Sequence, residues 1–258
     1  MNVEAELDRI VKFIQKLVQD SRTAGIVVGV SGGIDSATTA ALCVRAIGKE
    51  KVFALLMPIH SSEDDLKDAK LVASHLGIKF KTINLTESFD IFFTALSQDL
   101  DADPLAKANL KPRMRMCTLY FYSNQMNYLV AGTGNKSEDD VGYFTKYGDG
   151  GVDFLPIRHL YKHEVRELAR FLKIPEKIVT RKPSAGLWEG QTDEDELSSQ
   201  LGFPVTYDLL DEMLENIEKD NYDKNDEKYK KLTELKRRNH HKLELPPALN
   251  RTFSPEIE

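Results

Sequence analysis

The stretch "GIVVGVSGGIDSATTAAL", residues 25–42, decides the fold of this chain. Its first six residues are mostly β-branched and apolar, which predicts a buried strand, and the small residues after Asp35 predict a helix. Between them, Gly32 and Gly33 allow a tight backbone turn. A strand, a glycine turn and a helix in this order direct backbone N–H groups and the positive end of the helix dipole towards an anion. The stretch therefore predicts an anion-binding site.

This glycine loop differs from two other phosphate-binding motifs. A Walker loop requires GxxxxGK[ST], and no lysine follows the glycines here. The dinucleotide fingerprint GxGxxG also fails, because the residues from Gly29 onward read G-V-S-G-G. Asp35 would repel a bare phosphate, whereas Mg²⁺ can bridge a carboxylate to phosphate oxygens. The motif SGGIDS therefore predicts a metal-bridged pyrophosphate, and the alternative is a purely structural strand-to-helix turn.

Further strands and helices alternate along the chain. Apolar runs predict strands at residues 51–59, 78–85 and 128–135. Amphipathic segments between them predict helices that begin near residue 61, at 86–100 and at 103–127, the last interrupted near Pro112. This alternation predicts an α/β fold with a doubly wound parallel sheet that helices cover on both faces.

The chain is predicted to be a single domain with four parts. A glycine-rich, charged stretch at 136–157 and a stretch with the only Trp, Trp188, at 180–197 indicate functional loops. The predicted parts are an N-terminal helix (1–20), a nucleotide-binding core (about 21–180), a mobile substrate loop (about 181–200), and C-terminal helices with a tail (201–258).

The composition restricts the class of protein. The chain has 258 residues, of which 41% are apolar and 29% charged, as in ordinary globular proteins. Its net charge of -6 disfavours nucleic-acid binding, and no apolar run approaches the roughly 20 residues that span a bilayer. Cys43 and Cys117 are far apart, which disfavours disulfides and zinc ribbons. We expect a cytoplasmic enzyme without nucleic-acid or membrane partners.

The motif SGGIDS resembles that of the PP-loop ATP pyrophosphatases, which cleave ATP between its α and β phosphates. Two longer stretches, residues 131–157 and 182–197, resemble signatures of the NAD synthetase family. The segments "RMRM" (113–116) and "HHKLELPP" (240–247) extend the resemblance over nearly the whole chain. It implies a Rossmann-like fold of the adenine nucleotide alpha hydrolase type and a ligase that converts deamido-NAD to NAD. In that family the nicotinate carboxylate attacks ATP, and ammonia then displaces AMP.

The resemblance implies a set of residues for ATP and Mg²⁺. The first step brings two anions together, so their charge must be neutralised. Asp35 and Glu138 match metal ligands, and Lys162 matches a lysine that contacts the phosphates. The positions that match ATP contacts are Gly29, Val30, Ser31, Gly32, Gly33, Ile34, Asp35, Ser36, Thr133, Lys162 and Ser184.

Deamido-NAD and ammonia have their own candidate residues. By resemblance, the dinucleotide contacts Arg113, Lys146, Asp153, His241 and Lys242. Arg and Lys suit a substrate that carries a pyrophosphate and a carboxylate. Asp149 lies in "YGDGG", and we assign it to hold ammonium and accept its proton, which makes Asp149, Lys162 and Asp35 the predicted catalytic residues.

The resemblance also implies the nitrogen source and the assembly. Glutamine-dependent relatives carry an additional glutaminase domain, for which 258 residues leave no room, so free ammonia is the expected donor. The family is homodimeric, with deamido-NAD bound across the interface. The stretch 198–210 contains a small insertion relative to the family pattern.

Several alternative interpretations remain open. A tRNA-modifying enzyme that adenylates a base, or a nucleotide-binding module without catalysis, could share the glycine loop. His159 and His163 have the i, i+4 spacing of a zinc site, but no third ligand is evident, so a structural or solvent role is preferred. Trp188 is interpreted as a lid residue that orders on substrate binding.

Overall fold

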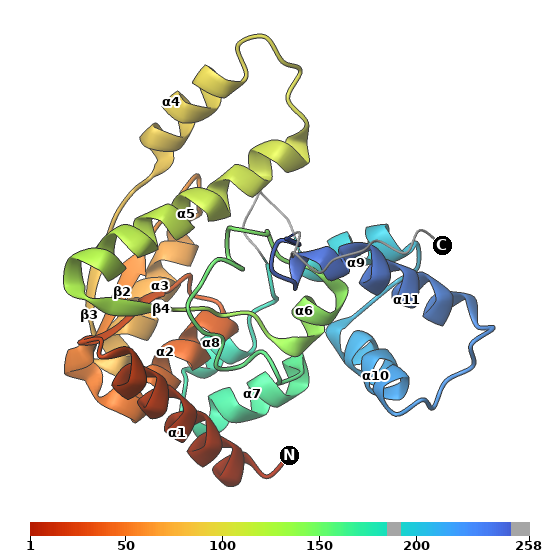
Figure 1. Cartoon of the computed structure of the whole chain (residues 1–258), viewed down its shortest axis with the longest axis horizontal. Helices are drawn as coiled ribbons and strands as arrows, with labels where there is room; N and C mark the ends of the chain where they lie inside the picture. The colour runs from red at the N-terminus through yellow and green to blue at the C-terminus, as the bar shows by residue number, and fades with distance from the viewer. Residues whose placement is uncertain (185–191, 249–258) are drawn as a thin grey trace.

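Four parallel strands form the central sheet, in the order β3-β2-β1-β4 (Figure 1). The structure, a computed structural model, describes residues 1–184 and 192–248. The strands are β1 Gly25–Gly29, β2 Val52–Leu56, β3 Lys79–Thr82 and β4 Tyr128–Ala131. In the middle of the sheet, Val27 pairs with Phe53 of β2 and with Val130 of β4. The predicted doubly wound parallel sheet is confirmed, with strands shorter than predicted.

The side chains of β1 alternate between two hydrophobic layers. Ile26 and Val28 belong to the main core, whereas Val27 faces the opposite side of the sheet, against helix α5. The helices of the main core are α1 Val3–Ser21, α2 Ile34–Ile47, α3 Glu63–Leu76, α7 Lys162–Phe171 and α8 Glu176–Val179. A 3₁₀ turn, η1 Lys49–Lys51, leads from α2 into β2. Both faces of β1 are therefore covered, as its apolar sequence predicts.

The connection order creates a crevice beside β1. From β1 the chain passes to β2 and β3 on one side of the sheet and then returns to β4 on the other side of β1. In such sheets, ligands bind outside the carboxyl ends of the strands where the strand order reverses. Residues 30–33 follow β1 and residues 132–135 follow β4, so both segments lie at this edge.

A second hydrophobic cluster lies beyond the sheet, on the right of Figure 1. Its helices are α6 Lys136–Val141, α9 Asp193–Leu201, α10 Tyr207–Glu218 and α11 Glu227–Asn239, which the 3₁₀ turn η2 His240–Lys242 follows. Tyr207 is fully buried in this cluster. Tyr161, immediately before α7, also belongs to it, so the cluster packs against the edge of the sheet that carries the crevice.

Helix α4 Thr86–Leu96 and the first part of α5 Pro104–Met126 form an arm that extends beyond the sheet, at the top of Figure 1, while the later part of α5 packs against β1 and β4. The predicted interruption of α5 near Pro112 is wrong, because the helix continues through it. A proline lacks the N–H that would bond the carbonyl four residues earlier. Pro112 is buried, and a Cβ on Gly148 would lie 3.0 Å from the Cβ of Pro112. Helix α5 therefore packs tightly against residues 145–150 at the position of the missing hydrogen bond.

Candidate active site

The loop between β1 and α2 is held in shape by its own serines. Ser36 Oγ accepts from the backbone N–H of Ser31 at 3.2 Å and donates to the carbonyl of Gly33 at 3.0 Å. The two serine hydroxyls lie 3.1 Å apart. Gly32 has φ +86°, and a Cβ there would lie 2.9 Å from the Cβ of Asp68. Only glycine suits this position, because φ is positive and because the neighbouring residues leave no space for a side chain.

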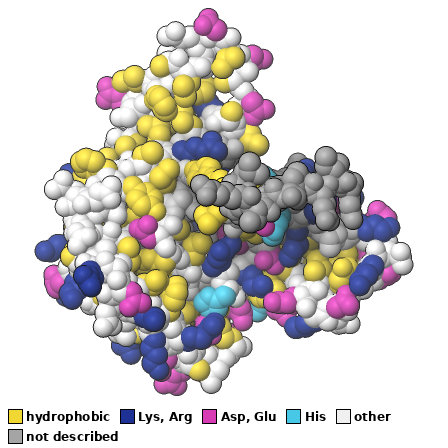
Figure 2. All heavy atoms as spheres, viewed as in Figure 1, with side chains coloured by type: hydrophobic (Ala, Val, Ile, Leu, Met, Phe, Trp, Pro, Cys, Tyr) yellow, Lys and Arg dark blue, Asp and Glu magenta, His cyan; other side chains and the backbone are white. Residues whose placement is uncertain are grey.

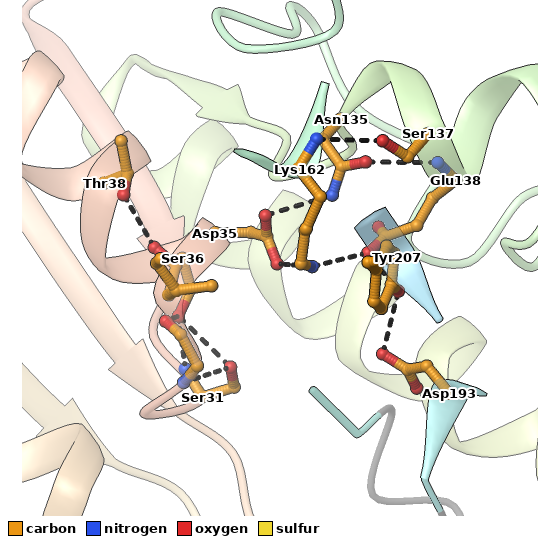
Figure 3. A network of polar contacts seen from close by, with 12 residues as sticks. Ser31, Asp35, Ser36, Thr38, Asn135, Ser137, Glu138, Lys162, Asp193 and Tyr207 are labelled. Carbon is orange, nitrogen blue, oxygen red and sulfur yellow. Dashed lines mark hydrogen bonds and ion pairs between the residues drawn. The ribbon is translucent and has the colours of Figure 1, made fainter. Parts of the chain in front are cut away.

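Two carboxylates and one ammonium group meet at the reversal point of the sheet (Figure 3). Asp35 lies in the first turn of α2, Glu138 in α6, and Lys162 is the first residue of α7. Lys162 Nζ lies 2.7 Å from Asp35 Oδ2 and 2.8 Å from Glu138 Oε1, and its side chain is 1% exposed. The structure thus brings together three predicted site residues from separate segments of the chain.

The protonation of this cluster follows from burial and charge. Burial, only partly offset by the Lys162 ammonium, and the neighbouring charges of Asp35 and Asp193 raise the pKa of Glu138 to about 7. Burial opposes the charge on Lys162, but the two carboxylates outweigh it and raise the pKa of that ammonium above its usual value. Lys162 is therefore a permanent cation at this edge of the sheet.

Asn135 connects the two acidic residues. Its Nδ2 donates to Asp35 Oδ1 at 3.0 Å, and its Oδ1 accepts from the backbone N–H of Glu138 at 3.1 Å. It is the N-cap of α6 and is fully buried. One side chain therefore caps the helix that carries Glu138 and orients the carboxylate of Asp35.

We expect Asn135→Ala to lower the free energy of unfolding by about 1–3 kcal/mol, because it removes a cap and leaves buried polar groups without a partner. Asn84→Ala is the matched control, since Asn84 Oδ1 accepts from the N–H of Thr86 at an exposed site. Chemical denaturation measures both changes. Equal losses in the two variants would contradict this role for Asn135.

The start of α7 is fixed by two buried polar side chains. Ser137 Oγ accepts from the backbone N–H of Lys162 at 2.9 Å and donates to Asp211. Asp211 Oδ2 accepts from the backbone N–H of His163 at 3.0 Å and lies 3.0 Å from its Nδ1. The backbone of Lys162 is thereby held by α6, and that of the next residue, His163, by α10.

The two histidines with i, i+4 spacing contact different carboxylates. His159 precedes α7, and its Nε2 lies 2.6 Å from Glu6 Oε1, while His163 contacts Asp211. Within residues 1–184 and 192–248, no cluster of three or more His, Cys, Asp or Glu side chains could hold a metal.

Most of the residues predicted for deamido-NAD lie together, beside η2 and α5. Arg113 Nη2 donates to the backbone carbonyl of Lys146 at 3.4 Å, and Lys146 Nζ donates to the backbone carbonyl of His241 at 2.5 Å. Lys242 Nζ donates to the carbonyls of Gly142 at 2.7 Å and Phe144 at 3.1 Å. Three cationic side chains and the backbone of His241, from distant parts of the chain, thus gather in one region.

Asp149 lies next to this region. Its Oδ1 accepts from the backbone N–H of Thr145 at 3.0 Å. Partial desolvation by the surrounding chain raises the pKa of Asp149, while that bond and the charge of Lys242 partly oppose the rise. Arg115 is a second nearby cation; its Nε donates to the carbonyl of Met57 at 2.9 Å, and burial lowers its pKa against the attraction of Asp149.

The glycines around Asp149 allow close packing of the chain. A Cβ on Gly148 would lie 2.9 Å from Thr145, and one on Gly150 would lie 2.7 Å from the ring of Phe144. These glycines therefore allow the chain to fold closely on itself.

Three further predicted residues are Asp153, Thr133 and Ser184. Asp153 Oδ2 accepts from the backbone N–H of Val130 at 2.7 Å, and its Oδ1 accepts from the hydroxyl of Tyr120 at 3.1 Å. Thr133 follows β4 at the crevice, and Ser184 is exposed at the end of the first described range. Trp188 lies outside the described residues.

Sequence reasoning missed three residues that contact the acidic pair or orient it: Asn135, Asp193 and Tyr207. Tyr207 OH lies 2.9 Å from Glu138 Oε1 and 3.1 Å from Asp193 Oδ2 (Figure 3). The Asn-x-x-Glu spacing of Asn135 and Glu138 is typical of a helix N-terminus and could have indicated the first. Nothing in the local sequence of the other two indicates their contacts with a segment about 60 residues earlier.

Comparisons with known proteins identify the family of this chain. The family model described as NAD synthase matches residues 6–246. An NH(3)-dependent NAD(+) synthetase from Archaeoglobus fulgidus is 49% identical over 250 residues, which cover 96% of this chain and 97% of that protein. The structure of NMN synthetase from Francisella tularensis has 34% identity and a TM-score of 0.85, and the match covers 98% of this chain and 100% of that one. The NH3-dependent NAD synthetase from Campylobacter jejuni has 33% identity and a TM-score of 0.80, with 97% and 100% covered. The chain therefore belongs to the NAD synthase family.

Proposed function

We propose that this chain is an ammonia-dependent NAD synthetase, which uses ATP to convert the nicotinate carboxylate of deamido-NAD into an amide. The observation that carries this proposal is the cluster of Asp35, Glu138 and Lys162 beside the glycine loop, at the edge of the sheet where nucleotides bind. The cluster offers a cation for the phosphates and two carboxylates for a metal. Relatives of the same length carry the ammonia-dependent name, which supports free ammonia as the donor.

The donor set fits Mg²⁺. This ion typically takes one or two carboxylates and completes its shell with water and phosphate oxygens. Asp35 and Glu138 supply two carboxylates that already converge on one cation, the ammonium of Lys162. When bound, the metal would neutralise charge on the phosphates of ATP.

The first step forms the acyl adenylate. One oxygen of the substrate carboxylate bonds to the α-phosphorus of ATP, the bond between the α and β phosphates breaks, and pyrophosphate leaves. Lys162 supplies positive charge where negative charge develops, and the start of α2 with its glycines faces the leaving pyrophosphate. The region of Arg113, Lys146 and Lys242 holds the dinucleotide, which is itself an anion.

The second step forms the amide. The nitrogen of ammonia bonds to the acyl carbon, and AMP leaves with the oxygen that joined it to that carbon. Asp149 lies near Arg115 and Lys242, whose positive charges act on it. Its carboxylate can hold ammonium close to the acyl group and accept a proton from it. We place this enzyme in the cytoplasm, where ATP is available.

A similar structure is named an NMN synthetase, so a mononucleotide acceptor is the second candidate substrate. We expect the purified protein, with ATP, Mg²⁺ and ammonium, to amidate deamido-NAD with a kcat/KM at least about 10-fold higher than its kcat/KM for nicotinate mononucleotide. The reason is that only the dinucleotide has a second phosphate and an adenosine that the basic region can bind. Product analysis by liquid chromatography measures both rates. A reversed preference would assign the mononucleotide as the substrate.

We also propose that the chain forms a homodimer through its arm. Five apolar side chains of α4, α5 and their connection are more than half exposed: Ile91 at 66%, Leu96 at 51%, Leu100 at 69%, Leu105 at 54% and Phe121 at 65%. Figure 2 shows apolar side chains gathered along this arm. Exposed apolar patches of this kind mark interaction sites. Arg113 lies on the same helix as Leu105, so a second copy seated on the arm would border the predicted dinucleotide site.

We expect Ile91→Glu combined with Leu105→Glu to convert the dimer to monomers, because it places charges in an apolar interface. Phe171→Glu, at an exposed phenylalanine at the end of α7, is the control and should remain dimeric. Sedimentation velocity measures the mass of each. A monomeric wild-type protein, or an unchanged dimer in the double variant, would contradict this interface.

No helix within the described residues is long and apolar enough to cross a membrane.

A further inference from the structure

We propose that Tyr207 is a positioning residue for the metal site: its hydroxyl holds one oxygen of Glu138 and thereby presents the other oxygen to Mg²⁺. This inference rests on the proposed function, because it assumes that Glu138 is a metal ligand. Tyr207 itself contacts neither reacting group, and it belongs to a helix far along the chain from the glycine loop.

The geometry separates the two oxygens of the Glu138 carboxylate. Oε1 accepts from Lys162 Nζ at 2.8 Å and from Tyr207 OH at 2.9 Å. Oε2 has no hydrogen bond from the described residues and is not among their buried polar atoms that lack a partner, so it is accessible. A carboxylate held through one oxygen and open at the other is prepared to bind a cation.

The hydroxyl of Tyr207 keeps this contact when Lys162 is engaged elsewhere. In the proposed reaction, Lys162 turns its charge to the phosphates of ATP, and the tyrosine then remains as the protein donor on Glu138. The surroundings of Tyr207 favour this role. Its side chain is completely buried, and it is the first residue of α10, directly after the N-cap Thr206. A rigid donor of this kind orients a ligand at little entropic cost.

Tyr207 also connects the metal site to α9. Its OH lies 3.1 Å from Asp193 Oδ2, and Asp193 is the first residue of α9 (Figure 3). A single hydroxyl has one proton, so it donates to Glu138 or to Asp193 at any moment. The contact with Asp193 therefore connects the metal site to the start of α9.

The ring and the hydroxyl of Tyr207 can be tested separately. Lys162 Nζ lies 4.6 Å from the centre of the ring, so the ring stabilises the ammonium group. Tyr207→Phe keeps the ring and its packing and removes only the donor to Glu138. Tyr229→Phe is the matched control, because Tyr229 packs against the same cluster and its hydroxyl accepts from Asn216 at 3.1 Å, away from the metal site.

The test measures binding of Mn²⁺, an EPR-visible substitute for Mg²⁺, in the presence of α,β-methylene-ATP and without deamido-NAD. Loss of a group that supports a metal ligand typically weakens metal binding about 10- to 100-fold. We expect Tyr207→Phe to weaken Mn²⁺ binding by at least about 10-fold, with the KM for ATP at saturating Mg²⁺ unchanged and Tyr229→Phe like the wild type. In a Glu138→Gln background, Tyr207→Phe should have no further effect.

A second variant keeps the hydroxyl. With 3-fluorotyrosine at position 207, the fluorine resonance should shift when Mg²⁺ and the ATP analogue are added, and this shift should be absent in Glu138→Gln. Wild-type Mn²⁺ affinity in Tyr207→Phe, equal weakening in Tyr229→Phe, or an unchanged fluorine resonance would each overturn the proposal. Formation of NAD by the wild-type protein tests the proposed function independently, so the two failures are distinguishable.

Discussion

Lys162→Met is expected to reduce NAD formation by at least about 1000-fold, because it removes the cation that faces the phosphates during adenylation. The same change leaves the carboxylates of Asp35 and Glu138 without their cation. Removing one partner of a buried ion pair typically lowers the free energy of unfolding by about 3–5 kcal/mol. Mg²⁺ alone should therefore raise the melting temperature of the variant more than that of the wild type. Steady-state kinetics and thermal unfolding with and without Mg²⁺ measure both effects.

Lys136→Met is the control for this prediction. Lys136 is the first residue of the neighbouring helix α6, and its Nζ lies 3.5 Å from Glu218 Oε1 at a more exposed site. Exposed ion pairs contribute about 0–1 kcal/mol, so this variant should keep its activity and nearly all of its stability. A Lys162→Met protein with normal activity, or with no additional response to Mg²⁺, would refute the role of Lys162.

The second large effect separates the two chemical steps. Asp35→Asn should abolish adenylation, so that exchange of labelled pyrophosphate into ATP falls by about 1000-fold in the presence of deamido-NAD. Asp149→Asn should retain most of that exchange and lose NAD formation by about 100-fold, because general base catalysis contributes roughly 10²–10⁴-fold. Measuring exchange and NAD formation on each variant distinguishes the roles.

Two outcomes would contradict these assignments. If Asp149→Asn lost exchange and NAD formation equally, Asp149 would serve binding or folding and not the ammonia step. If Asp35→Asn retained exchange, the carboxylate beside Lys162 would not hold the metal. Asp153→Asn is a suitable comparison, because Asp153 bonds Tyr120 and the backbone of Val130. It should affect stability and dinucleotide binding more than either chemical step.

The local part of this fold was predictable from the sequence, because it depends on periodicity and on turn chemistry. The run at 25–30 predicted a buried strand and SGGIDS a glycine turn before a helix, and β1 and α2 confirm both. The parallel sheet followed from the alternation of strands and helices. Pro112 misled the prediction of α5, because burial against Gly148 is a tertiary effect that helix propensity does not contain.

The candidate site was predictable only in part. Asp35 and Lys162 are 127 residues apart, and no periodicity relates them; the family resemblance identified both. Tyr207 and Asp211, which hold Glu138 and the start of α7, belong to helix α10, whose sequence indicates only an amphipathic helix. Contacts between distant segments depend on how the helices pack, which a single sequence does not state.

The most direct test of the account follows the carboxylate oxygen of the acceptor. Deamido-NAD labelled with oxygen-18 in its nicotinate carboxylate is incubated with the wild-type protein, ATP, Mg²⁺ and ammonium, and the products are analysed by mass spectrometry. The proposed reaction predicts NAD, unlabelled pyrophosphate, and AMP that carries one labelled oxygen, because the carboxylate bonds to the α-phosphorus and AMP leaves with that oxygen. Formation of ADP with the label in inorganic phosphate, or no label in AMP, would contradict it.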